Sequence, residues 1–388
     1  MRTCRRCLLP AAVPGADLDA DADGVCAFCR QHDRADRSRA ESLRRAWEAD
    51  LEKALAGCRG RGRGGYDCLV CFSGGKDSCY LLHKLAVERR LRVLAFTVNI
   101  NVPEVAWDNI RRTIARLDVD HLVYTPPQEF YLRMFRHLLK NQEARGAVRT
   151  VCYACAPLTE SYALQVATEK GIPLVLAGYS PGQPDADRMT YEFAPWMIRE
   201  LDWTPPELRR SGLFPEAELS RFWNPRRYPA GTSFPRFLAP FHAWKYSQAE
   251  VMKAVVKLGL IRNGKHASPV HSNCPVNWLL MYSDLQNLGY NSYAPEFCRL
   301  IREGRASRRY WSVMQPVVNW MIRSRLLLGR NVTRSLRVLG LAPEELRITR
   351  PAEPPPEPPA SRGESRPPEA GTEAEEPCCA HCGAGDGR

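Results

Sequence analysis

Short apolar runs alternate with amphipathic segments through the middle of this chain. Four of the runs have the length and the β-rich composition of buried strands. The predicted strands cover residues 68–72, 91–98, 121–124 and 172–177. Segments with helical spacing of apolar residues lie between them, at residues 77–86, 107–117, 129–142 and 163–170. This alternation predicts an α/β fold, in which helices cover both faces of a parallel sheet.

The pattern changes on both sides of this central part, which we place at residues 66–200. Residues 33–65 predict a linker helix and a loop, and residues 238–345 predict a helical C-terminal part. Residues 201–237 hold proline, arginine and aromatic residues without a period, which predicts a lid-like insert or, alternatively, a disordered one. Residues 346–388 are rich in Pro, Glu, Gly and Ser and predict a disordered tail.

Charge and cysteine content indicate partners and compartment. The 388 residues include 55 Lys and Arg against 43 Asp and Glu, which gives a net charge of +12. A basic protein suits anionic partners such as ATP, nucleotide sugars or RNA, but arginine-rich composition also arises from genomic bias. The first residues lead into no apolar run, so we expect no signal peptide, and no run approaches the ~18 apolar residues of a membrane span. The 15 cysteines, mostly in Cys-x-x-Cys pairs, predict a cytoplasmic protein with metal-bound thiolates.

The segment 302–337 is the most basic part of the chain. It holds nine arginines and one acidic residue, Glu303, together with Tyr310, Trp311 and Trp320. Arginines bind phosphates and aromatic rings stack on bases, so one interpretation is a surface for RNA. The alternative is a solvated helix face.

The N-terminal residues 1–32 hold two cysteine pairs, Cys4-x-x-Cys7 and Cys26-x-x-Cys29. Two such pairs wrap one ion tetrahedrally, and a segment this short has little core of its own. We therefore predict a structural zinc knuckle. A redox dithiol and free thiols are the alternatives.

The stretch Ser73-Gly-Gly-Lys-Asp-Ser78 joins the first predicted strand to the first predicted helix. A Gly-rich turn of this kind directs backbone N–H groups and a helix N-terminus at one point, and Lys76 adds a positive charge. Gly74 and Gly75 let phosphate oxygens approach the backbone. The stretch therefore predicts a phosphate site at the carboxyl edge of the sheet. It is not a Walker A loop, which needs Ser or Thr at the position of Asp77.

These six residues resemble in full the signature of the PP-loop ATP pyrophosphatase superfamily, which has an adenine nucleotide alpha hydrolase-like fold. The resemblance implies an enzyme that cuts ATP between its α and β phosphates and adenylates a substrate oxygen. A nitrogen or sulfur nucleophile then displaces AMP. Lys76, Asp77 and Ser78 are the implied catalytic residues, with Asp77 placing Mg²⁺. The implied ATP-binding residues are Ser73, Gly74, Gly75, Lys76, Asp77, Ser78, Asn99 and Gly178.

The chain departs from this superfamily beside Gly178. Relatives tend to have Gly-Glu-Asn here, whereas this chain has Gly178-Tyr-Ser180 and lacks the acid. Asp185 and Asp187 are alternatives for holding Mg²⁺, or they cap a turn. Many relatives also have Asp at the position of Asn99, where adenine and ribose are expected.

A second cysteine set follows the signature. Cys152-x-x-Cys155 with the remote Cys274 is similar to the layout of the tRNA 2-thiocytidine synthetase group, in which three cysteines hold a [4Fe–4S] cluster. The alternatives are a zinc site, closed by Cys298 or His271, and unmetallated thiols. The tail ends in another group, which binds metal, carries a persulfide or is incidental. It comprises Cys378, Cys379, His381 and Cys382.

Over about residues 1–310 the order of features resembles the N-acetyl sugar amidotransferase family of polysaccharide biosynthesis. Matching features include the paired N-terminal cysteines, Gly65-Tyr-Asp-Cys68, the signature, Trp244-Lys-Tyr246 and Gly289-Tyr290. The resemblance implies ATP-dependent activation of a carboxylate on a nucleotide-linked sugar, with ammonia from a separate glutaminase. Thiolation of a tRNA base or nucleobase, with a sulfur-donor protein, is the alternative function. A non-enzymatic ATP-sensing or scaffold role is the third.

Overall fold

The computed structural model has a five-stranded, fully parallel sheet at its centre, in the order β3-β2-β1-β5-β6. The structure describes residues 2–18, 23–34, 37–100, 102–181, 188–268 and 274–358. The strands of the sheet are β1 (Cys68–Cys71), β2 (Val93–Val98), β3 (Asp120–Tyr124), β5 (Leu174–Ala177) and β6 (Arg236–Leu238). Four of them match the predicted strands within two residues at each end. The predicted α/β fold is therefore confirmed.

Four strands of the sheet contribute alternate residues to two separate cores, whereas the edge strand β3 contributes to one of them. Val70, Ala95 and Leu176 belong to one hydrophobic cluster, whereas Leu69 and Phe96 belong to the other. Successive side chains of a strand point to opposite faces, so a strand buried on both faces is apolar throughout. This is why the predicted strands appear in the sequence as continuous apolar runs.

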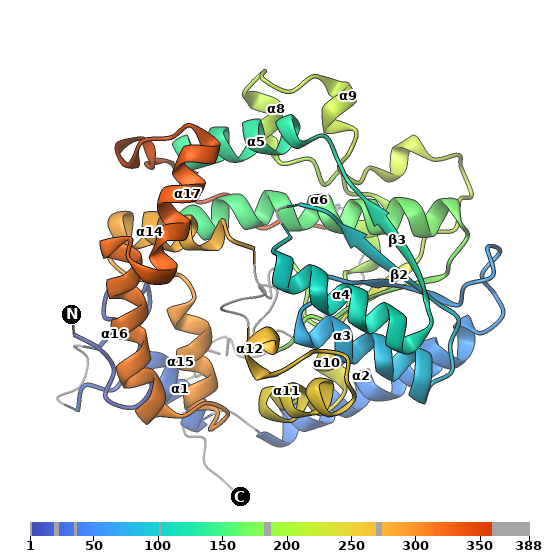
Figure 1. Cartoon of the computed structure of the whole chain (residues 1–388), viewed down its shortest axis with the longest axis horizontal. Helices are drawn as coiled ribbons and strands as arrows, with labels where there is room; N and C mark the ends of the chain where they lie inside the picture. The colour runs from blue at the N-terminus through green and yellow to red at the C-terminus, as the bar shows by residue number, and fades with distance from the viewer. Residues whose placement is uncertain are drawn as a thin grey trace, which may run out of the picture.

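Helices cover both faces of this sheet (Figure 1). One cluster packs residues of α2 (Arg37–Cys58), α3 (Lys76–His83), α4 (Glu104–Leu117), α10 (Pro240–Ala243) and α11 (Gln248–Lys257) against the sheet. The π-helical turn η1 (Lys84–Glu88) continues α3, and α12 (Gly264–Ala267) lies against α4. The other face is covered by α5 (Gln128–Lys140) and α6 (Ala147–Glu169). Helix α6 begins sixteen residues before the predicted helix 163–170, despite Pro157 in its interior.

The segment 201–237, predicted as a lid-like insert, forms short helices that pack partly into the core. It follows α7 (Pro195–Arg199) and forms α8 (Pro206–Arg210), α9 (Glu216–Leu219), the 3₁₀ turn η2 (Pro225–Arg227) and the beginning of β6. Its aromatic residues Phe222 and Trp223 are fully buried in the cluster around α5 and α6. Prolines set the ends of its short helices, which explains why its sequence shows no helical period.

The C-terminal part is helical, as predicted, and lies beside one end of the sheet (Figure 1). It contains α14 (Asn277–Asn287), α15 (Ala294–Arg302), α16 (Arg308–Ser324) and α17 (Arg330–Leu339), with 3₁₀ turns η3 (Leu327–Gly329) and η4 (Pro343–Glu345). Order extends past residue 346, where the tail was expected to begin. Strand β7 (Ile348–Arg350) pairs with β4 (Gln142–Glu143), and Leu346 is buried. The cysteine and histidine group at 378–382 lies outside the described residues.

The glycine of the signature turn limits what the fold tolerates at position 74. Gly74 has φ +74°, and a Cβ there would lie 2.5 Å from the Ala106 carbonyl oxygen of α4 and 2.8 Å from Ile110 Cγ1. Gly60 has a similar φ of +67° but nothing within 4 Å of a Cβ. Alanine substitutions at Gly60 and Gly74 therefore separate two losses of stability, one from the left-handed backbone and one from the clash with α4.

We expect Gly60→Ala to lower the free energy of unfolding by about 1 kcal/mol, the cost of the backbone conformation. Gly74→Ala should cost roughly 1–3 kcal/mol more, because α4 must move. Urea unfolding followed by circular dichroism measures both values. Equal losses in the two variants would contradict the close packing of α4 on the turn.

Candidate functional site

The signature turn lies at the carboxyl edge of the sheet, between the ends of β1 and β5. Gly178 follows β5 directly, and a Cβ at this position would lie 3.0 Å from the backbone nitrogen of Ser78. On the other side, the buried Asn109 side chain of α4 donates to the Gly74 carbonyl oxygen at 2.9 Å. The turn is therefore fixed between β5 and α4, and glycine at 178 allows the close approach.

Helix α3 starts at Lys76 without a capping side chain. Its N-cap residue, Gly75, has extended backbone geometry and offers no side chain to the first N–H groups. The hydroxyl groups of Ser73 and Ser78 lie 3.3 Å apart, and Ser78 also bonds the Ser73 N–H. Uncapped N–H groups, the positive end of the helix and two hydroxyls form a site that favours an anion such as phosphate.

Lys76 and Asp77 extend this site on its polar side. The Lys76 side chain is largely buried, and its Nζ donates to Asp77 Oδ2. The other carboxylate oxygen, Oδ1, accepts a 2.7 Å hydrogen bond from the hydroxyl of Tyr246. Burial, and then the neighbouring Asp77 charge, raise the pKa of Tyr246 well above its usual value, so this hydroxyl remains a donor at neutral pH. Each carboxylate oxygen of Asp77 retains a second lone pair beside its hydrogen bond, which is available to a Mg²⁺ ion.

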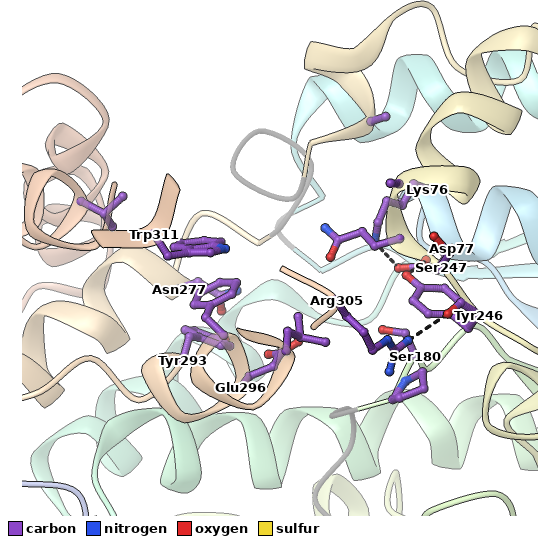
Figure 2. A pocket seen from close by; sticks show the side chains of 18 of the residues that line it. Lys76, Asp77, Ser180, Tyr246, Ser247, Asn277, Tyr293, Glu296, Arg305 and Trp311 are labelled. Atoms are coloured by element: carbon purple, nitrogen blue, oxygen red, sulfur yellow. Dashed lines mark hydrogen bonds and ion pairs between the residues drawn. The ribbon is translucent and has the colours of Figure 1, made fainter. Parts of the chain in front are cut away.

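A cavity of about 490 Å³ opens beside Gly75, Lys76 and Asp77. Figure 2 shows Lys76 and Asp77 at one end, Tyr293 and Trp311 at the other, and Arg305 between them. The far end is largely aromatic, with Trp278 and Phe297 also in its wall. The cavity thus joins an anion site to a set of aromatic faces, which suits a ligand with a charged group and a flat or apolar ring.

Asn99 is separate from this cavity. It follows β2, where its backbone N–H bonds the Tyr124 carbonyl oxygen at 2.8 Å and its side chain bonds Thr125. It does not line the cavity, whereas Gly75, Lys76 and Asp77 do. Adenine binding at Asn99 therefore stays a prediction. Asn101, Asp185 and Asp187 lie outside the described residues.

The structure brings Cys152, Cys155 and Cys274 into one neighbourhood. Cys152 and Cys155 are one turn apart on α6, and each interacts electrostatically with Cys274. Cys274 lies in the cavity wall. Among the described residues, one group of cysteines has all its sulfur atoms within 4.8 Å of one another, and it is the N-terminal group. The sulfur atoms of Cys152, Cys155 and Cys274 are therefore farther apart than this. They are therefore too widely spaced for all three to hold a single zinc ion in this arrangement.

Burial makes these three thiols poor nucleophiles without a metal. It raises the pKa of Cys152 to about 12 and raises that of Cys155 well above its usual value, with the neighbouring Cys274 adding to both shifts. Burial also raises the pKa of Cys274. A neutral thiol is a weak ligand and a weak nucleophile, so thiolate chemistry here needs a cation that stabilises the charge. A cluster with several irons fits wider sulfur spacing than one ion does.

The N-terminal cysteines form the closed site that was predicted. The Sγ atoms of Cys4, Cys7, Cys26 and Cys29 all lie within 4.8 Å of one another, and all four residues are buried. Two of these sulfur pairs are 3.9 and 3.6 Å apart. Tetrahedral zinc with bonds of about 2.3 Å requires sulfurs about 3.8 Å apart. The four residues therefore fit one zinc ion, which would stabilise a segment with little core of its own.

This knuckle packs on α15, which also forms part of the cavity wall. Cys298 of α15 belongs to the same hydrophobic cluster as the four cysteines, and Arg302 Nη1 lies 3.6 Å from Cys7 Sγ. On the same helix, Phe297 and Leu300 line the cavity. Cys298 is thus beside the knuckle, which counts against it as a fourth ligand for the Cys152 set. His271, the other candidate, lies outside the described residues.

Three groups near the site were not predicted as site residues from the sequence. Tyr246 and Arg305 approach Asp77 and the cavity from distant segments, and Arg305 Nη2 donates to the Tyr246 carbonyl oxygen at 3.0 Å. Glu160 of α6 is fully buried, accepts from the Tyr179 hydroxyl at 2.6 Å and pairs with Arg188. It provides a carboxylate beside Tyr179, where relatives tend to have Glu. Of these three, only Tyr246 was indicated by the sequence, through the Trp244-Lys-Tyr246 match to the amidotransferase family.

Comparisons with known proteins found distant structural similarity and no match to a family model or a curated protein. The similar solved structures include the U34-tRNA thiolase NcsA from Methanococcus maripaludis with its [4Fe–4S] cluster, at 12% identity and a TM-score of 0.34 over 88% of this chain and 89% of that one. NMN synthetase from Francisella tularensis has 12% identity and a TM-score of 0.34 over 78% and 97%. NH₃-dependent NAD synthetase from Campylobacter jejuni has 14% identity and a TM-score of 0.32, over 74% of this chain and 96% of that one.

TM-scores below 0.5 at these identities do not assign a function to this chain. No helix in the part of the chain that the structure describes is long and apolar enough to cross a membrane. The functional argument therefore depends on the cavity and its residues.

The knuckle gives a metal-binding prediction. We expect the purified chain to hold zinc at the knuckle, and Cys26→Ser to lose about one equivalent per chain, because three thiolates leave the tetrahedral site open. Elemental analysis after gel filtration measures the zinc. Cys58→Ser is the control, since Cys58 is buried elsewhere and its Sγ donates to a carbonyl oxygen, as a serine hydroxyl also can. Equal zinc in both variants would contradict the assignment.

Proposed function

We propose that this chain is an ATP-dependent enzyme that adenylates an oxygen of an acceptor bound in the cavity and releases pyrophosphate. One observation carries the proposal: the uncapped start of α3, with Lys76 and Asp77, opens directly into a cavity large enough for a second ligand. The six-residue resemblance to the PP-loop signature supplies the reaction type.

In this proposal the residues of the turn have distinct roles. The first N–H groups of α3 and Nζ of Lys76 bind the β and γ phosphates, while the Ser73 and Ser78 hydroxyls donate to phosphate oxygens. Asp77 would hold Mg²⁺, which offsets charge on the departing pyrophosphate. Tyr246 orients Asp77 through its hydroxyl. The acceptor oxygen attacks the α phosphorus, and its bond to AMP then makes it a good leaving group.

The far end of the cavity supports an anionic acceptor with a ring. Arg305 lies between the two ends and provides positive charge, and Trp278, Phe297 and Trp311 provide faces for a sugar or a base. A carboxylate on a nucleotide-linked sugar, amidated by ammonia from a separate glutaminase, follows from the amidotransferase resemblance. A cytoplasmic location is consistent with these substrates and with a reduced knuckle.

Sulfur transfer is the second candidate, and the position of Cys274 favours it. Cys274 is in the wall of the same cavity as Lys76, and Cys152 and Cys155 are its electrostatic neighbours. The three would hold a [4Fe–4S] cluster, which supplies sulfur chemistry when it is bound. In this case the acceptor is a tRNA base or a nucleobase.

The adenylation step is tested by changing the lysine of the signature. We expect Lys76→Ala to lower pyrophosphate release by at least about 100-fold, because the charge that stabilises the leaving group is lost. Lys253→Ala is the control, since Lys253 is exposed on α11 and does not line the cavity. Circular dichroism checks that both variants fold. Normal release by the Lys76 variant would show that the turn does not bind the triphosphate.

The transferred group is tested at Cys274. If nitrogen is transferred, Cys274→Ala should keep ammonia-dependent AMP formation within about twofold, because no thiolate takes part. Anaerobically purified protein should then lack stoichiometric iron and sulfide. Iron and sulfide that are present in the native chain and lost in Cys274→Ala, together with lost turnover, would establish sulfur transfer instead. Cys298→Ala, beside the knuckle, serves as the control for this loss.

A further inference from the structure

Exposed large apolar side chains are concentrated on one small part of this protein. Of the ten in the described residues, seven belong to α16, η3, α17 and the residues between them. They are Tyr310, Val313, Val317, Trp320, Leu326, Leu327 and Val338. An exposed apolar patch on a soluble chain marks a surface that contacts something. We name this set the α16 face.

Four of these residues form a continuous stripe along α16. Tyr310, Val313, Val317 and Trp320 follow one another at intervals of three, four and three residues, which places them on one side of a helix. The opposite side of α16 is accounted for, because Ile322 is buried and Trp311 and Val318 line the cavity. Figure 1 shows α16 at the outer edge of the molecule. The stripe is therefore a second apolar side that the fold does not cover.

Arginines without an acidic partner in the described part of the chain flank the α16 face. Five of them are exposed and make no side-chain hydrogen bond or ion pair with any described residue. They are Arg309, Arg323, Arg330, Arg334 and Arg337. Elsewhere in the chain many surface arginines do pair, for example Arg133 with Glu218 and Arg209 with Asp202. The face thus combines apolar side chains with unneutralised positive charge.

The turn between α16 and α17 projects leucines at a cost in backbone energy. Arg325 and Leu327 both have positive φ, of 57° and 51°. Leu326 and Leu327 are nonetheless exposed, Leu327 by 64% of its surface. A left-handed leucine is unfavourable by about 1–2 kcal/mol. A turn that faces only solvent is expected to contain polar residues or glycine, without backbone strain or exposed leucines. We therefore interpret this turn as part of a surface that contacts a partner.

Three kinds of partner are distinguishable by chemistry. A second copy of this chain would set the same five arginines against one another, which disfavours association through this face. RNA would bind the arginines and stack on Tyr310 and Trp320, but it would leave Val313, Val317 and the leucines without an apolar partner. An anionic bilayer surface binds both the arginines and the apolar side chains, since its headgroups bind arginines and its acyl region accepts aliphatic and aromatic side chains.

We propose that the α16 face docks on anionic phospholipid membranes as a peripheral contact. Val313, Val317 and Leu327 enter the headgroup–acyl boundary, Tyr310 and Trp320 lie at its level, and the arginines bind lipid phosphates. Because Val318 and Trp311 on the inner side of α16 line the cavity, the cavity is held one helix away from the bilayer. This inference is independent of the reaction proposed for the site.

Vesicle co-sedimentation tests this proposal with the full-length protein. The vesicles are pure phosphatidylcholine, or phosphatidylcholine with about 30% phosphatidylglycerol, at low and high salt. We expect binding to the anionic vesicles at low salt, weakened by salt, and little binding to the neutral ones. No binding to anionic vesicles would overturn the proposal.

Two variants probe the two halves of the face. Arg330→Glu with Arg334→Glu should lower the bound fraction about tenfold, and Leu326→Ser with Leu327→Ser should also lower it about tenfold. Arg112→Glu with Arg116→Glu on α4 changes the net charge equally at exposed positions far from this face, and it should bind like the native chain. Trp320 fluorescence also loses its lipid-induced blue shift in the leucine variant.

The other partners give different results in the same set of variants. Binding of a fluorescent 20-nucleotide poly(U) that falls in the arginine variant but not in the leucine variant, without vesicle binding, would assign the face to RNA. Dimerisation at high protein concentration that is lost in the leucine variant would assign it to a second copy. Binding to vesicles that is unchanged in both variants would place the membrane contact elsewhere and overturn the proposal.

Discussion

The contact between the carboxyl end of β5 and the first turn of α3 sets the position of the whole site. Gly178 has no side chain, so the backbone of Ser78 can lie against it, and Asn109 fixes the other side of the turn through Gly74. With its first turn held on both sides, α3 presents its unpaired N–H groups to the cavity. A side chain at position 178 would push α3 away and move Lys76 and Asp77 with it.

The cavity depends on elements from both ends of the chain. The signature turn forms one wall, and α14, α15 and α16 form the other. Helix α15 carries cavity residues such as Phe297 and knuckle contacts such as Cys298 and Arg302. A metal that holds the knuckle therefore supports α15 from outside the site. Through α15 the knuckle therefore supports the cavity wall that faces the signature turn.

Sequence reasoning was accurate where local constraints are strong and poor where they are weak. Three of the four predicted strands, β1, β2 and β5, are buried on both faces and are therefore largely apolar, whereas the edge strand β3 is only partly buried. Residues 201–237 were predicted as a lid because proline and arginine hide the period of three very short helices. Their core residues, Trp223 and Phe222, are buried by packing on α5 and α6, and no local pattern encodes this contact. Helix α6 is much longer than the predicted helix 163–170, and it continues through Pro157 although proline is unfavourable inside a helix.

The sequence by itself determined the parallel sheet, the glycine-rich turn before α3 and the four-cysteine knuckle. Each of these is a property of neighbouring residues: short apolar runs between helical segments, glycines before a helix, and cysteines paired at a spacing of three residues. Only the tertiary structure decided that Tyr246 bonds Asp77, that Cys274 enters the same cavity as Lys76, and that Cys298 lies at the knuckle. These contacts join segments more than 100 residues apart, and long-range packing fixes them without leaving a periodic signal in the chain.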